Sequence, residues 1–298
     1  MLRASAYRPV LICALSYGSA VAFARMSFED GSNALTVVTV RCLFSMVAIG
    51  IAMRLMGAVP ALPRERRLML ALGVVFALNV YAFYKSVELL RVPLAILCFY
   101  VYPLLSGLFS ALAGLERISA RTAGFALVSF AGLALATGAS PEAVNLHGVG
   151  LALLSAVMIA VLLVVSTRYV AHVEAKTRTF WMMASTSLTL AGATIATDAA
   201  AWPVRAHGWA ALAAVCVLYA IGVVALFTSA SRIGATRTAM MMNLEPVVAI
   251  SASWLLLGQG LTLLQLLGGG LVIAGVLGSQ LLQGPGAPRP PAANPAAG

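Results

Sequence analysis

One apolar stretch of this sequence, residues 236–258, holds a carboxylate beside a proline near its middle. A membrane-spanning helix takes roughly 20 residues, and helical rise places Glu245 about 13 Å from the start of the stretch, near the bilayer midplane. A charge at that depth costs at least a few kcal/mol unless it faces protein or water. Pro246 has no N–H, so the carbonyl of Met242 loses its helical partner. Both defects predict an interior cavity around Glu245.

Glu245 is the strongest candidate for chemistry. A carboxylate that is removed from water holds a proton more readily, which suits proton coupling, and it could also pair with a cationic substrate or side chain. The alternative is a static ion pair that only fixes packing.

A second polar motif lies beside a proline in the first half of the chain. It overlays the first motif when the sequence is moved by 143 positions, the separation of Pro103 and Pro246. Two equivalent polar pairs at two helix-breaking prolines predict one site built from two halves, with ordinary helix packing as the alternative. The pairs are Tyr100 and Tyr102 before Pro103, and Asn243 and Glu245 before Pro246.

Two cations also lie inside apolar segments. Arg41 is on the order of 10 Å from the nearer end of its segment, too deep for easy snorkelling. It could hold a substrate carboxylate or pair with Glu245, and buried charges do both. Lys85 is roughly 8 Å from a segment end, so it either lines a cavity wall or snorkels to the interface.

Other side chains could contact an organic solute. Asn79 could hydrogen-bond a solute, or a neighbouring helix instead. Aromatic rings could pack on a solute while tyrosine hydroxyls orient it. Tyr84 lies beside Lys85, and Tyr17, Trp181 and Tyr219 are weaker aromatic candidates.

Several classes of site are excluded by pattern. The histidines are far apart and form no HExxH motif, no Walker motif is present, and the four cysteines form no CxxC pair. The sequence therefore predicts no metal, no cofactor, no disulfide and no enzyme.

Composition identifies a multi-pass membrane protein. Of 298 residues, 61% are hydrophobic and 9% are charged, against about 25% charged in soluble domains. The net charge of +10 comes from basic residues between apolar runs, so it reflects topology and not nucleic-acid binding.

Ten membrane spans are predicted in an all-α fold. They divide the chain into a cytoplasmic segment 1–8, a first repeat 9–138, a second repeat 147–283 and a disordered cytoplasmic tail 284–298. The expected spans are 9–26, 34–56, 68–90, 92–113, 119–138, 147–168, 179–197, 208–231, 236–257 and 261–283.

Each repeat has five spans, and because five is odd the second repeat must be inverted relative to the first. With the N-terminus inside, only Arg25, Arg91 and Arg205 fall on outer segments, as the positive-inside rule requires. We therefore expect both termini in the cytoplasm.

This arrangement resembles the EamA-like branch of the drug/metabolite transporter superfamily, over about residues 9–282. The resemblance implies a secondary transporter of the bacterial inner membrane, commonly an exporter of amino acids or other small metabolites, with a central cavity and peripheral fifth and tenth spans. Gln259 departs from the family, which usually has a glutamate there, whereas Glu116 keeps it in the first repeat. The motifs that carry the resemblance are Tyr100 to Pro103 with Leu115 to Ser119, and Asn243 to Pro246 with Gly258 to Thr262 and Gly268 to Gly275.

We therefore expect a proton- or gradient-driven exporter of a small solute, working by alternating access between the repeats. A zwitterion such as an amino acid fits the charges, and amphipathic cations fit nearly as well. The alternative is a non-transporting component, such as a lipid-carrier flippase partner or assembly factor. Glycines of the tenth span permit close contact within the repeat or with a second copy, so a homodimer through the fifth and tenth spans is also expected.

Overall fold

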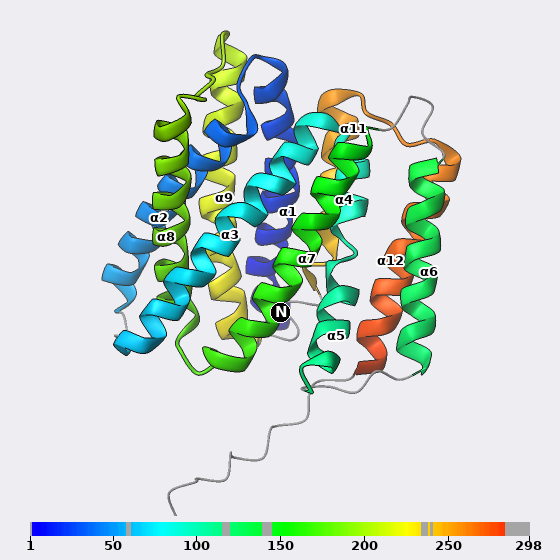
Figure 1. Ribbon diagram of the computed structural model, residues 1–298, viewed down its shortest axis with the longest axis horizontal. Helices are drawn as coiled ribbons and strands as arrows, with labels where there is room; N and C mark the ends of the chain where they lie inside the picture. The colour runs from blue at the N-terminus through cyan, green and yellow to red at the C-terminus, as the bar shows by residue number, and fades with distance from the viewer. Residues whose placement is uncertain are drawn as a thin grey trace, which may run out of the picture.

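The computed structural model is built from helices packed side by side (Figure 1). It describes residues 2–57, 61–114, 120–138, 145–233, 238 and 241–283, and these contain no strand. The predicted tail 284–298 lies outside the described residues. The helices are α1 Leu2–Glu29, α2 Ala34–Met56, α3 Pro63–Leu89, α4 Val92–Phe99, α5 Tyr102–Leu112, α6 Ala120–Gly138, α7 Leu146–Tyr169, α8 Ala175–Thr197, α9 Ala206–Ile233, α11 Leu244–Leu257 and α12 Leu263–Gln283.

Local sequence sets several helix ends. Asn33 and Asn145 begin α2 and α7, and each side chain accepts a hydrogen bond from a backbone N–H of the first turn. Gly57 and Gly258 end α2 and α11 with φ of 72° and 64°, a backbone conformation that glycine adopts without steric cost.

The two proline motifs stand at interruptions. The fourth span is divided at Tyr100 and Val101, between α4 and α5. In the ninth span, Met242 and Asn243 form a turn before α11 begins at Leu244. Each proline therefore lies in the first turn of the helix that follows, where its missing N–H costs little.

Most helix contacts occur twice, with equivalent helices of the two repeats taking each other's places. Helix α1 packs on α9 and α11, and the equivalent α7 packs on α3, α4 and α5. Likewise α3 packs on α8 while α9 packs on α2. In three further pairs, a helix packs on its own equivalent in the other repeat, namely α2 with α8, α4 with α11, and α6 with α12. The predicted fold class is confirmed, because each helix finds the partner that two inverted five-helix repeats require.

Helices α6 and α12 stand together at one edge of the bundle (Figure 1). Their glycines are used within the chain, since a Cβ on Gly132 would lie 2.5 Å from the carbonyl oxygen of Gly268, and one on Gly275 would lie 2.1 Å from Ser129 Oγ. The homodimer through these helices stays a prediction.

Apolar side chains cover the outside of the bundle as well as its core. Leu55, Leu112, Leu127 and Ile195 are all exposed by more than two thirds, although each is large and apolar. Among the described residues, six helical segments are long and apolar enough to cross a membrane, one of them α4 and α5 together, and three shorter helices are also apolar. A surface of this kind faces lipid, not water.

Candidate functional site

The two interrupted spans meet inside the bundle. The Tyr100 hydroxyl, at the end of α4, lies 3.3 Å from the Met242 carbonyl oxygen and 3.4 Å from Glu245 Oε2. The Met242 carbonyl also accepts the backbone N–H of Glu245 at 2.9 Å. The carbonyl that Pro246 deprives of its helical partner is thus satisfied by the turn and by a tyrosine of the other repeat.

Aromatic rings surround this meeting point on the first-repeat side. The rings of Tyr100 and Tyr102 are 5.7 Å apart, and Phe99 lies 5.1 Å from Tyr102 and 4.7 Å from Phe83. Glu245 is half-buried beside them, on the first turn of α11. Its carboxylate therefore contacts the phenol hydroxyl of Tyr100.

Arg41 lies in the interior on α2, only 1% exposed. Its guanidinium carbon is 3.8 Å from the ring centroid of Tyr219 and 4.8 Å from that of Tyr84. Its Nε is buried without a hydrogen-bond partner. Rings attract a desolvated cation, but they do not replace the hydrogen bonds that a guanidinium can donate.

Tyr17 of α1 lies near both charged groups. Its ring stacks on Tyr219 with centroids 4.8 Å apart, and its hydroxyl is in electrostatic range of both Arg41 and Glu245. Arg41 and Glu245 form no ion pair, so the pairing left open by the sequence is not present in this structure. The central cluster, as we define it, comprises Tyr17, Arg41, Tyr84, Tyr100, Tyr102, Tyr219 and Glu245.

The structure places the other candidates elsewhere. Asn79 donates to the carbonyl and hydroxyl of Ser155 at 2.7 and 2.8 Å, which joins α3 to α7. Trp181 lies near the start of α3, with the guanidinium carbon of Arg66 5.3 Å from its ring. Asn243 occupies the N-cap of α11, beside the cluster but without a side-chain cap bond.

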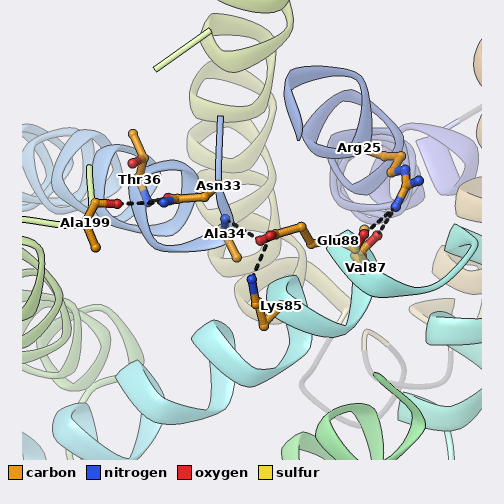
Figure 2. Close-up of polar contacts among 8 residues, drawn as sticks. All are labelled: Arg25, Asn33, Ala34, Thr36, Lys85, Val87, Glu88 and Ala199. Carbon is orange, nitrogen blue, oxygen red and sulfur yellow. Dashed lines mark hydrogen bonds and ion pairs between the residues drawn. The ribbon is translucent and has the colours of Figure 1, made fainter. Parts of the chain in front are cut away.

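Lys85 belongs to a polar network at the end of the bundle where α1 and α3 finish (Figure 2). Its Nζ lies 2.7 Å from Glu88 Oε1, and the backbone N–H of Ala34 donates to Glu88 Oε2 at 2.9 Å. Arg25 donates to the carbonyls of Val87 and Glu88 at 2.9 and 2.7 Å. These bonds tie the ends of α1 and α3 to the start of α2.

The same end carries contacts between the repeats, and we call it the Asp30 end. Asp30 accepts the backbone N–H of Arg205 at 2.7 Å and lies 3.4 Å from His207 Nε2. The backbone N–H of Val92 donates to Gln259 Oε1 at 2.9 Å, so this glutamine caps α4 from the other repeat. Glu116, its counterpart, lies outside the described residues.

No group of three or more metal-ligating side chains occurs among the residues that the structure describes. The four cysteines are buried and free. The central cluster offers one cation and one carboxylate among phenol hydroxyls, and these groups can bind a charged solute.

Comparison with known families decides the identity. The model of the EamA-like transporter family matches residues 6–138 and, a second time, residues 146–280. The chain belongs to the EamA-like transporter family. It is therefore a multi-pass membrane transporter of the drug/metabolite type, and the resemblance seen in its motifs is confirmed.

A solved crystal structure supports the fold of this EamA-like transporter. It matches with a TM-score of 0.64 over 94% of this chain and 97% of the other, at 20% sequence identity. At that identity the likeness speaks for the fold alone. No curated protein matches the chain.

Some residues of the site were weak or absent in the sequence reasoning. Tyr219 was only a minor candidate, although its ring is the nearer partner of Arg41. Arg25 and Glu88 stand at span ends, where charges are ordinary, so their residue types do not point to a site. The one sequence signal for their network is the number of charged residues near that end of α3.

Proposed function

We propose that this transporter is a secondary active exporter of a small zwitterionic metabolite, such as an amino acid, working by alternating access at the repeat interface. One observation carries the proposal. A fully buried guanidinium from the first repeat and a carboxylate from the second lie in one tyrosine-rich cluster without pairing with each other. Unpaired opposite charges in a membrane interior suit a solute that carries both charges.

The substrate carboxylate would bind Arg41, whose Nε has no hydrogen-bond partner in the part of the chain that the structure describes. A guanidinium holds a carboxylate through two parallel hydrogen bonds, and its flanking rings fix the plane of the fork. The substrate ammonium would face Glu245, and its side chain would pack on Tyr17, Tyr100 or Tyr102.

Glu245 is also the group that we propose for proton coupling. Its oxygen is already in contact with the Tyr100 hydroxyl, which can remain in place whether the carboxyl is charged or protonated. Protonation from the outside would release the substrate ammonium, and deprotonation to the inside would reset the site.

We propose an orientation in the bacterial inner membrane with both termini cytoplasmic. Exposed arginines gather at the end of the bundle opposite the Asp30 end, including Arg54, Arg64, Arg66 and Arg67. The positive-inside rule assigns that end to the cytoplasm.

The experiment is uptake and efflux in proteoliposomes under an imposed pH gradient. A growth-protection screen of an overexpressing strain, against amino acids and cationic toxicants, selects the solute. Glu245→Gln should abolish the dependence of flux on the gradient, and Arg41→Gln should abolish transport of the zwitterion.

The methyl ester of the same solute separates the two charges. If the ester is carried by the Arg41→Gln variant as well as by the parent, Arg41 binds the carboxylate. Gradient-dependent flux that survives Glu245→Gln would remove the coupling role. No flux for any solute, with the fold intact, would favour a non-transporting component.

A further inference from the structure

An open groove of about 640 Å³ shares no lining residue with the central cluster. Helices α1, α2 and α9 form it, with α9 contributing the longest part of the lining. That part is apolar, from Ala220 through Val224 to Ala225. Ile12 of α1 and Ile221 of α9 line it too and are 46% and 44% exposed.

Two arginines, Arg8 and Arg232, stand at one end of this groove. Both are exposed, and neither has a carboxylate within 4.0 Å in the described part of the chain. The three helices of the groove contain one acidic residue, Glu29, which is about 30 Å from Arg8 at helical rise. The end of the groove is thus positive with no internal counter-charge.

The depth of these groups matches a lipid. The apolar segment 9–26 of the sequence begins directly after Arg8. The apolar segment 208–231 ends directly before Arg232. Both guanidiniums are therefore at headgroup level, while the lining from Ala220 to Ala225 lies at the level of the acyl chains.

We propose that the groove binds an anionic phospholipid of the leaflet at the N-terminal end of α1. The phosphate accepts hydrogen bonds from Arg8 and Arg232, and one acyl chain lies along α9 between α1 and α2. Basic pockets between membrane helices recognise anionic headgroups in this way. The site is independent of the proposed transport activity, because it shares no residue with the central cluster.

The test is lipid retention by the purified full-length protein, measured by native mass spectrometry after delipidation. Phosphatidylglycerol and phosphatidylcholine with the same chains are added back at matched concentrations. The parent protein should retain phosphatidylglycerol in preference, and Arg8→Gln with Arg232→Gln should weaken that retention about thirtyfold, since each surface arginine contributes several-fold.

The matched control is Arg64→Gln with Arg67→Gln, which removes the same charge from exposed positions at the same end of the bundle, outside the groove. Equal losses in the two double variants would reduce the effect to general surface charge and overturn the site. Ala48→Trp fills the groove from α2 without changing charge, and it should also lower retention. Unchanged retention in that variant, or no preference for phosphatidylglycerol in the parent, would equally overturn it.

Discussion

Arg41 is costly to the fold unless its surroundings compensate for lost water. A cation at membrane depth carries a penalty of at least a few kcal/mol. Two tyrosine rings within 5 Å supply part of the compensation, and Tyr219 is the nearer of them. A desolvated cation–π contact is worth about 2 kcal/mol, so the rings hold the guanidinium but leave its Nε available for a ligand.

This division of roles predicts the behaviour of Tyr219 variants. Tyr219→Leu should lower the free energy of unfolding by about 2 kcal/mol, because the guanidinium loses its closest ring. Tyr219→Phe keeps a ring and should stay within about 0.5 kcal/mol of the parent. Thermal unfolding in detergent measures both, and equal losses in the two variants would show that the hydroxyl, not the ring face, supports Arg41.

Tyr100 links the two interrupted spans through a single hydroxyl. Tyr100→Phe removes the contacts to Met242 and Glu245 and should cost about 1 kcal/mol of stability. Glu245→Ala removes one of those contacts from the other side. The stability lost in the double variant should therefore be smaller than the sum of the two single losses, by at least about 0.5 kcal/mol. Strict additivity in the unfolding measurements would show that the two side chains act separately.

At the scale of helices, hydropathy and charge were sufficient to predict most of the architecture. The expected span 34–56 is α2 itself, and 179–197 differs from α8 only in its first turn. Apolar length is a property of each helix alone, so no knowledge of neighbours is needed.

The site depends on how each helix is rotated and what faces it, and the sequence does not state this. Asn79 and Ser155 pair across α3 and α7, and Lys85 is drawn to Glu88 at the Asp30 end. By residue type alone, Asn79 and Lys85 could have lined a solute cavity as readily as they form these structural contacts. Arg41 and Glu245 could be placed at depth from sequence, but the tyrosines around them come from four different membrane spans.

Helix contact at the site relies on two glycines. A Cβ on Gly18 would lie 2.8 Å from the Glu245 carbonyl oxygen, and one on Gly222 would lie 2.3 Å from the Tyr17 ring. Gly18→Ala should therefore push α1 away from α11 and lower both flux and the unfolding temperature.

Gly150 and Gly192 provide the control, because a Cβ there meets nothing within 4 Å. Gly150→Ala should leave flux unchanged and stabilise α7 by up to about 1 kcal/mol through helix propensity. Loss of function in Gly150→Ala equal to that in Gly18→Ala would mean that backbone flexibility, not close packing, is what these glycines supply.

For the whole molecule, the proposed alternating access would make this structure one of two states, with the repeats in contact at the Asp30 end. Inverted repeats exchange their conformations during alternating access, so contacts present at one end must break in the other state. Asp30 with Arg205, and Val92 with Gln259, both cross between repeats at the Asp30 end. If that end opens to release substrate, these contacts are broken once in every cycle.

Cross-linking tests this directly. Asp30→Cys with Arg205→Cys places two thiols across the repeats, where the native side chain and backbone N–H are 2.7 Å apart. The four native cysteines are buried, so the parent protein treated with the same reagent gives the background reaction. A short bifunctional thiol reagent should stop flux in proteoliposomes, and a cleavable form of that reagent should restore flux when reduced. Arg25→Cys with Glu29→Cys is the control, because these solvent-accessible side chains are 2.9 Å apart within α1, so a cross-link there ties no repeat to the other. Full flux in the cross-linked Asp30–Arg205 variant, with linkage verified by mass spectrometry, would mean that the two repeats need not separate at this end.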